Sequence, residues 1–288
     1  MILNASGCLD ALTAPEVARS LDAFVTKTVT PEPREGNDPP RIAETDHGML
    51  NSIGLQNPGR ERFLAESLPR LVDLGPPVWV SVGGFSAQDY AESCAALDGT
   101  GAAALELNLS CPNVDEAADG AAAIVAACRA ATTKPLYAKL SPAHWDLGEV
   151  ARAVQAAGAD GLSLINTMRG LALEPRTLKP RLGRGAGGYS GPALRPIALA
   201  AVHACYRATG GLAIVGMGGV ETGRHALELA AAGASAVALG TVLFADPGAP
   251  ARVRAELAQE LEILGLASLD EARGLAHDLP SVVRADNT

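Results

Sequence analysis

Short apolar runs alternate with longer stretches of helical character along most of the chain. Six runs, nearly all apolar, lie at 78–82, 103–109, 136–140, 161–165, 212–216 and 236–240. Strands of this kind are typical of a parallel sheet that is buried on both faces. Helix-like stretches follow them at 86–97, 119–131, 146–157, 192–208, 221–232 and 249–264. The alternation predicts six successive β–α units.

Two further strands are predicted upstream, at 1–4 and 22–28, with helix-like stretches after them at 14–21 and 59–73. Eight β–α units match a (β/α)8 TIM barrel, for which ~250 residues is typical. The alternative is a doubly wound open sheet, which would favour a GxGxxG turn after an early strand. No such turn occurs in the sequence. We therefore expect an α/β protein with a single barrel domain over 1–288.

Two connections, 28–58 and 166–191, are too long to be simple turns. Long loops in a compact domain are usually functional. Both follow predicted strands, so they lie on the face of the barrel where active sites are found.

Composition narrows the class of protein and its partners. The chain is 48% hydrophobic and 19% charged, which is typical of a globular protein with a sizeable core. Aromatic residues make up only 3%, so the core must consist of Ala, Val, Leu and Ile. The net charge of −9 argues against nucleic acid as a partner, because bulk electrostatics would oppose binding. The negative net charge is still compatible with a small anionic substrate that binds in a local basic pocket.

Several further features exclude membrane, disulfide and metal chemistry. No apolar stretch reaches the ~20 residues of a membrane span, and the first ten residues do not resemble a signal peptide. The five cysteines show no CxxC spacing, and the five histidines occur singly. Neither pattern favours a disulfide framework or a metal site. The sequence predicts a reduced, cytoplasmic protein without a metal.

Unusual polar residues follow the predicted strands at the point where each strand ends. In a barrel these positions meet at one rim. The rim residues are Lys27, Asn108, Ser110, Cys111, Asn113, Lys139, Ser141, Asn166, Thr167, the run Gly216–Gly219, Gly240 and Thr241.

The glycine-rich turns after the last two strands indicate a phosphate site. GMGG (216–219) and GT (240–241) expose backbone N–H groups and allow a ligand to approach closely. Barrels often bind phosphate after their seventh and eighth strands. The alternative interpretation is that these glycines only form tight turns. A phosphate site would suit a phosphorylated substrate or a phosphate-bearing cofactor.

The segment NLSCPN (108–113) indicates acid–base chemistry beside a polar ring. Cys111 is expected in a loop with polar neighbours, where an accessible thiolate can act as a base or nucleophile. Asparagine amides such as those of Asn108 and Asn113 can bind an amide-bearing ring without adding charge. The alternative for Cys111 is a small buried apolar residue. That alternative is favoured for Cys94, Cys128 and Cys205, whereas the sequence leaves Cys8 open.

Two lysines at strand ends indicate an anionic or electron-rich ligand. Lys139 is the only charged residue of its strand, and a buried lysine must find an anion or an electron-rich group. Lys27 ends the second strand and is interpreted in the same way. The alternative is that both side chains extend to solvent.

Seven motifs, taken together, resemble dihydroorotate dehydrogenase. They run in order through nearly all of 1–247, which makes the match more specific than any single motif. The resemblance implies a (β/α)8 barrel that carries FMN and oxidises dihydroorotate to orotate in pyrimidine biosynthesis. The motifs are TKTVTPEPREGNDPPR (26–41), NSIGLQNPG (51–59), ELNLSCPNV (106–114), AKLSP (138–142), GLSLINT (161–167), GGYSGPALRPIAL (187–199) and GMGGVETGRHALELAAAGASAVALGT (216–241).

The cysteine in NLSCPN is similar to that of the soluble class 1 enzymes. Class 2 enzymes carry serine there and a membrane-binding N-terminal extension, and neither is expected here. GLQNPG and EPREGN look most like class 1B. That class implies a homodimeric catalytic core and a second subunit, with FAD and a [2Fe–2S] cluster, that passes electrons to NAD⁺.

The resemblance also implies roles for individual residues. Cys111 would remove the proton from C5 of dihydroorotate while hydride leaves C6 for N5 of FMN. Lys139 would lie near the N1/C2 edge of the flavin and stabilise the charge of the reduced ring. The implied substrate-binding residues are Lys27, Asn51, Ser52, Ile53, Gly54, Leu55, Asn108, Asn113, Asn166 and Thr167. The implied FMN-binding residues are Ser6, Lys27, Thr28, Asn108, Lys139, Ile165, Gly191, Gly218, Gly219, Gly240 and Thr241.

Two other function classes stay open from the sequence. One is a different FMN-dependent barrel oxidoreductase that acts on another cyclic amide or an enone. The other is a non-catalytic, phosphate-binding barrel that serves as a subunit of a larger assembly.

Overall fold

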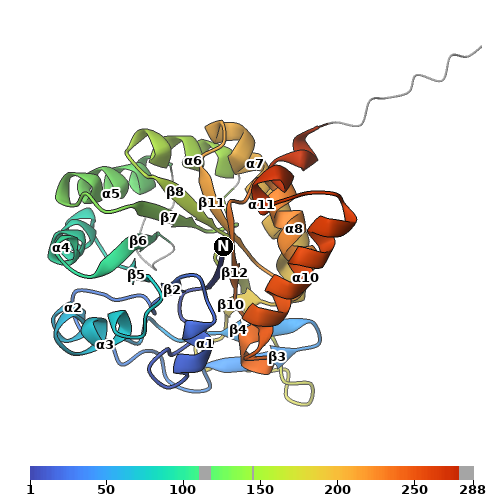
Figure 1. Cartoon of the computed structure of the whole chain (residues 1–288). Coiled ribbons are helices and arrows are strands. Elements are labelled where there is room, and N and C mark those ends of the chain that lie inside the picture. The colour runs from blue at the N-terminus through green and yellow to red at the C-terminus, as the bar shows by residue number, and fades with distance from the viewer. Residues whose placement is uncertain (110–117, 145, 279–288) are drawn as a thin grey trace, which may run out of the picture.

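The computed structural model describes residues 1–109, 118–144 and 146–278. Eight parallel strands form one sheet in the order β1–β12–β11–β8–β7–β6–β5–β2, and helices surround it (Figure 1). The (β/α)8 barrel expected from the sequence is therefore confirmed. The strands are β1 (Ile2–Asn4), β2 (Phe24–Val25), β5 (Val78–Val82), β6 (Ala102–Asn108), β7 (Leu136–Leu140), β8 (Gly161–Leu164), β11 (Ala213–Met217) and β12 (Ala236–Leu239).

The outer layer consists of helices that follow the strands in turn. Several begin at a Ser, Thr or Asp whose side chain accepts a hydrogen bond from the backbone N–H three residues on, namely Ser86, Asp146, Thr222 and Ser268. The longer helices are α4 (Ala87–Asp98), α5 (Ala118–Ala131), α6 (Leu147–Ala156), α7 (Arg195–Thr209), α8 (Gly223–Ala232) and α10 (Ala249–Ile263). The shorter ones are α1 (Pro15–Arg19), α2 (Arg60–Arg62), η1 (Phe63–Ser67), α3 (Leu68–Val72), η2 (Pro192–Leu194), α9 (Val242–Ala245), α11 (Leu269–Ala272) and η3 (Leu275–His277). No helix of the described residues is both long and apolar enough to cross a membrane.

The two long connections are not plain loops, because they pair into a second sheet. This antiparallel sheet has the order β3–β4–β10–β9. Its strands are β3 (Ile42–Thr45), β4 (Gly48–Asn51), β9 (Met168–Gly170) and β10 (Gly187–Ser190). Hydrophobic patterning missed them because they are short, and three of the four (β4, β9 and β10) contain glycine at paired positions. A Cβ at Gly187, for example, would lie 2.4 Å from the carbonyl oxygen of Asn51.

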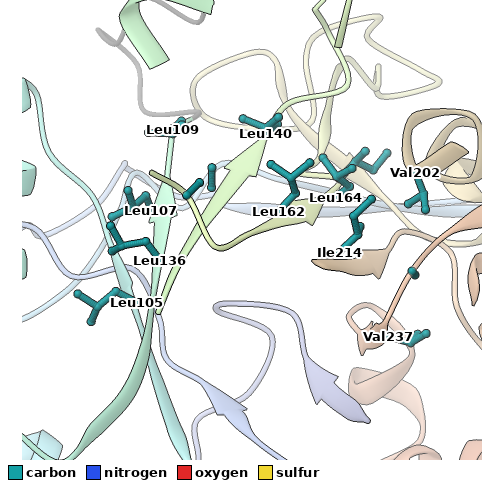
Figure 2. Close-up of a cluster of buried hydrophobic side chains, with 14 of the residues drawn as sticks. Leu105, Leu107, Leu109, Leu136, Leu140, Leu162, Leu164, Val202, Ile214 and Val237 are labelled. Carbon is teal, nitrogen blue, oxygen red and sulfur yellow. The ribbon is translucent and has the colours of Figure 1, made fainter. Parts of the chain in front are cut away.

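Leucines pack between the strands and the helices. Leu105 and Leu107 of β6, Leu136 of β7 and Leu162 and Leu164 of β8 are fully buried in this layer (Figure 2). Residues that alternate with them face the barrel axis. The strand periodicity therefore decides which side chains of each strand fill the barrel and reach its rim.

The inside of the barrel is filled mostly by small residues, with two aromatic rings among them. Trp79 and Tyr137 lie with ring centroids 4.4 Å apart. Tyr137 has room because its neighbour on β8 is Gly161, where a Cβ would come within 2.3 Å of the tyrosine ring. These two rings thus fill this part of the barrel, although the chain contains few aromatic residues.

Closure of the barrel depends on a side chain. Between β1 and β2 the backbone contributes the bridge from Leu3 to Ala23 and a hydrogen bond from the N–H of Asp22 to the carbonyl oxygen of Ile2 at 2.9 Å. The fully buried Asn4 side chain continues this pairing, because Nδ2 donates to the carbonyl oxygen of Val25 at 2.8 Å and Oδ1 accepts from its N–H at 2.8 Å. The side-chain amide of Asn4 therefore takes the place of further backbone hydrogen bonds between β1 and β2, the seam at which the barrel closes.

Asn4→Ala should lower the free energy of unfolding by about 2–4 kcal/mol, because it leaves a buried donor and a buried acceptor of Val25 unpaired. Urea denaturation followed by circular dichroism measures this change. Gln88→Ala, which removes an exposed hydrogen bond to Glu92 on α4, is the control and should stay within about 0.5 kcal/mol of wild type. Equal midpoints for the two variants would contradict the role given to Asn4.

Candidate active site at the carboxyl ends of the strands

A cavity of about 280 Å³ opens where the barrel strands end. Ligand sites are commonly concave and of roughly 300–1,000 Å³, so this cavity lies just below that range. Residues distant in the sequence meet in it because parallel strands end at one rim. The predicted site residues that line it are Ser6, Lys27, Thr28, Asn51, Ile53, Asn108, Lys139, Ile165, Asn166, Thr167, Gly191, Gly218, Gly219, Gly240 and Thr241.

A buried ion pair forms part of the cavity floor. Nζ of Lys139 lies 3.3 Å from Oε1 of Glu106, and the two side chains are only 7% and 1% exposed. The sequence analysis did not assign Glu106 a role. The sequence did contain a pattern that could have identified Glu106, because ELN (106–108) places it two residues before Asn108. The two residues therefore lie on the same face of β6.

A chain of hydrogen bonds orients the amides at the rim. Oγ1 of Thr28 accepts from Nδ2 of Asn108 at 3.2 Å, and Oδ1 of Asn108 accepts from Nδ2 of Asn166 at 3.0 Å. Oδ1 of Asn166 in turn accepts from the N–H of Thr167 at 2.8 Å. Four predicted residues, from the segment after β2, the end of β6 and the segment after β8, are thereby held in fixed orientations, which suits recognition of a polar planar ring.

The small antiparallel sheet supplies one wall of the cavity. Nδ2 of Asn51, at the end of β4, donates to the carbonyl oxygen of Gly188 at 3.2 Å. Ser190 of β10 accepts a hydrogen bond from Oγ1 of Thr241 at 2.9 Å and so ties this sheet to the turn after β12. Ile42 and Phe244 line the cavity and are more than half exposed, which gives it an apolar edge.

The glycine turns leave backbone donors available to a ligand. Among the described residues no acceptor is paired with the backbone N–H groups of Gly218, Gly219, Gly240 and Thr241. Gly218 and Gly219 have φ values of +123° and +72°, which other residues rarely adopt. Several N–H donors without acceptors around a cavity form a typical anion-binding arrangement.

Lys27 and Cys8 lie on the β1–β2 side of the cavity. Lys27 packs so closely on Gly7 that a Cβ there would lie 3.0 Å from the lysine Nζ. Burial raises the pKa of the half-buried Cys8 thiol, and the charges of Lys139 and Lys27 only partly oppose this effect. The structure thus places Cys8 among the cavity-lining residues, a point that the sequence left open.

The other described cysteines are packed in the hydrocarbon core, as the sequence indicated. Cys94, Cys128 and Cys205 are fully buried. Burial, and secondarily the charge of Asp146, raises the pKa of Cys205 to about 12.

Some predicted residues are not among those that line the cavity. Ser52, Gly54 and Leu55 belong to a loop that folds onto the preceding segment, where Oγ of Ser52 accepts from Nδ2 of Asn37 at 2.9 Å. A Cβ at Gly54 would lie 2.6 Å from the backbone nitrogen of Asn37. Of this predicted stretch only Ile53 reaches the cavity, because the loop's polar groups pair with Asn37. Cys111 and Asn113 lie outside the described residues.

Together, the barrel and the cavity define a (β/α)8 enzyme with its site at the strand ends. The sequence profile named "Dihydroorotate dehydrogenase" matches residues 1–261 of the chain. The chain belongs to the dihydroorotate dehydrogenase family, and it is an oxidoreductase.

Curated relatives and solved structures agree with this assignment. A Listeria monocytogenes (serotype 4a) protein is 42% identical over 283 residues, which cover 94% of this chain and 93% of that protein. A Desulforudis audaxviator protein is 46% identical over 265 residues, covering 89% and 86%. Both are named "Dihydroorotate dehydrogenase B (NAD(+)), catalytic subunit". The dihydroorotate dehydrogenase of Eimeria tenella, crystallised with ferulenol, has a TM-score of 0.80 and 26% identity, and the match covers 96% of this chain and 85% of that one.

A further relative has a different name. The protein of Solibacter usitatus, 45% identical over 258 residues that cover 86% of this chain and 84% of that protein, is named as a candidate dihydroorotate dehydrogenase A (fumarate).

Alkylation of Cys8 in the native protein should be slow at pH 7 and should accelerate as the pH rises. The thiolate is the reactive form, and a raised pKa keeps Cys8 protonated to a higher pH than the ~8.5 of a free cysteine. Iodoacetamide labelling of the Cys8 peptide, followed by mass spectrometry from pH 6 to 10, measures the profile. The same peptide in urea-unfolded protein provides the control, and coincident native and unfolded profiles would contradict the raised pKa.

Proposed function

We propose that the protein is a class 1B dihydroorotate dehydrogenase that uses FMN to oxidise (S)-dihydroorotate to orotate in pyrimidine biosynthesis. The observation that carries this proposal is the meeting, in one cavity, of glycine turns with unpaired N–H groups and a buried lysine. The first suits a phosphate and the second an electron-rich ring. FMN contains both, and the chain belongs to a family of dihydroorotate dehydrogenases.

The residues that line the cavity fit FMN. Gly218, Gly219, Gly240 and Thr241 would donate backbone hydrogen bonds to the phosphate. The isoalloxazine ring would lie against Ser6, Thr28, Ile165 and Gly191, with Lys139 and Lys27 supplying positive charge. When bound, FMN supplies the acceptor for the hydride that leaves C6 of dihydroorotate.

The amide-rich rim fits the pyrimidine substrate. Asn51, Asn108, Asn166 and Thr167, together with Asn113, would hydrogen-bond the ring and its carboxylate. Their orientations are fixed in part by the hydrogen-bond chain that begins at Thr28. Lys27 would offset the substrate's negative charge, and Ile53 would pack against the ring.

Cys111 is proposed as the base. Its thiolate would take the proton from C5, and the C5–H electron pair would form the new double bond as hydride leaves C6. One proton and one hydride together account for the two hydrogens lost from dihydroorotate. Because a free cysteine titrates near ~8.5, turnover should rise with pH through the alkaline range.

The two B-type relatives favour NAD⁺ as the final electron acceptor. We propose that a homodimeric core of this chain pairs with a second subunit, which carries FAD and a [2Fe–2S] cluster. The Solibacter relative supports fumarate as a second candidate acceptor. The acceptor decides between the two classes without changing the chemistry at C5 and C6.

Anaerobic mixing of the FMN-loaded protein with dihydroorotate tests cofactor and substrate together. The yellow absorbance of oxidised FMN should bleach after mixing with dihydroorotate and return on addition of the physiological oxidant. Recovery with fumarate alone would favour the type that the Solibacter relative is named for, dihydroorotate dehydrogenase A (fumarate). Recovery with NAD⁺ only when the second subunit is present would favour class 1B. FMN-loaded protein whose absorbance is not bleached by dihydroorotate or by any other pyrimidine substrate would contradict the proposal.

Cys111→Ala should keep FMN bound and lose about 10²–10⁴-fold in the rate of bleaching by dihydroorotate, the usual contribution of a general base. Stopped-flow absorbance measures the rate. Cys94→Ala is the matched control, because it removes a thiol that lies in the hydrocarbon core and does not line the cavity, and it should retain most of the rate. A normal rate in Cys111→Ala would remove this residue from the mechanism.

Gly240→Ala should fold normally but bind FMN at least about tenfold more weakly, a loss of about 1.4 kcal/mol. Among the described residues the added Cβ would meet Ala5 Cβ at 3.6 Å and Cys8 Sγ at 3.7 Å, both ordinary contacts, but it would take space from the proposed phosphate site. Fluorescence titration measures the affinity, and Tm should stay within about 2 °C of wild type. Gly99→Ala, which has no neighbour within 4 Å of its Cβ, is the control. Equal affinities for the two variants would contradict the phosphate site.

A further inference from the structure

A band of polar residues crosses the inside of the barrel beneath the cavity. It consists of Ser81 on β5, Glu106 on β6, Lys139 on β7 and Ser163 on β8, all at least 95% buried. Ser81 is in register with Glu106, and Lys139 is in register with Ser163. The residues on either side of each belong to the leucine-rich layer under the helices, so the band faces the barrel axis.

The band departs from the usual filling of such a barrel. Bulky branched residues normally occupy these inward positions. Here Glu106 has Ser81 as its in-register neighbour on β5, and Lys139 has Ser163 as its in-register neighbour on β8. The two serines leave room for Glu106 and Lys139, which extend toward each other to 3.3 Å.

The two partners of the ion pair differ in their access to the cavity. Lys139 lines the cavity, whereas Glu106 is not among the lining residues and is 1% exposed. Among the described residues, the carboxylate of Glu106 is the polar group that contacts the Lys139 ammonium. An ammonium has three N–H donors, so one faces Glu106 and two are available to a ligand above.

We propose that Glu106 is a positioning residue, which holds the Lys139 ammonium at the cavity floor and limits the positive charge that it presents to a bound flavin. This inference rests on the proposed function, because it concerns the same FMN. Because Lys139 lines the cavity and Glu106 does not, a ring bound above Lys139 would be nearer to the ammonium than to the carboxylate and would be attracted by the difference between the two charges. Glu106 thus sets how strongly the site stabilises the negative charge of the reduced ring.

Glu106→Gln separates the charge from the contact. Glutamine keeps an oxygen that can accept from Lys139 but removes the negative charge. At a fixed potential the ratio of reduced to oxidised FMN should rise at least tenfold, which for a two-electron couple is about 30 mV upward. Equilibration with a redox dye measures this ratio without turnover, and a purely structural role for Glu106 would leave it unchanged.

Four further proteins complete the test: Glu92→Gln, Lys139→Gln, the double variant of Lys139→Gln with Glu106→Gln, and Glu106→Asp. Glu92→Gln removes the acid that pairs with Arg60 at 3.8 Å on the outside of the barrel, and the ratio should not change. Adding Glu106→Gln to Lys139→Gln should change the ratio less than threefold, because a buried carboxylate that has lost its cation takes up a proton. Glu106→Asp, which withdraws the carboxylate by one methylene, should shift the ratio upward at least threefold and serves if Glu106→Gln does not fold.

FMN-loaded Glu106→Gln with a ratio within threefold of wild type would overturn the inference and leave the proposed function standing. An equal shift in the Lys139→Gln background would overturn it as well, because Glu106 would then act independently of Lys139. Wild-type protein that takes up no FMN would overturn both proposals.

Discussion

Closure of the parallel sheet is the constraint on which the site depends. With the barrel closed, alternate residues of every strand point to the axis, and the last of them meet at one rim. Lys27, Asn108 and Lys139 are brought together in this way from positions far apart in the chain. At the seam between β1 and β2 the closure relies on the amide of Asn4, only two residues before Ser6 at the cavity edge. The same seam therefore supports both the fold and one side of the site.

The site also depends on a second, smaller sheet that is added to the barrel. The segments between β2 and β5 and between β8 and α7 pair with each other as an antiparallel sheet, and this sheet forms a wall of the cavity. The hydrogen bond from Thr241 to Ser190 joins that wall to the glycine turn after β12. A barrel alone would leave the strand ends open to water. The added sheet gives the cavity a depth in which a planar ring can be enclosed.

The buried pair of Glu106 and Lys139 shows how function can determine a core residue. A buried ion pair seldom stabilises a fold more than well-packed hydrophobic residues would, yet loss of one partner commonly costs about 3–5 kcal/mol. Both charges must therefore be present or absent together. The barrel keeps both, flanked by two serines, where bulky apolar residues would be usual. An ammonium directed at a ligand site explains this choice better than stability does.

The sequence by itself determined the eight strands and the order of β–α units, because buried parallel strands have an apolar pattern. Polar residues at the strand ends stand out against this pattern, and they placed Lys27, Asn108, Lys139, Asn166 and Thr167 at the rim. The family resemblance, and not this pattern, added Ser6, Thr28, Asn51, Ile53, Ile165 and Gly191. The sequence also marked the turns at Gly218 and Gly240 as candidate anion sites, since the exposure of backbone N–H groups there is a local property. Only the tertiary structure decided that 28–58 and 166–191 pair with each other, that Glu106 is the partner of Lys139, that Cys8 lines the cavity, and that Ser52, Gly54 and Leu55 do not. These features depend on contacts between residues distant in the chain, and no local pattern of hydrophobicity or turn chemistry encodes which distant segments meet.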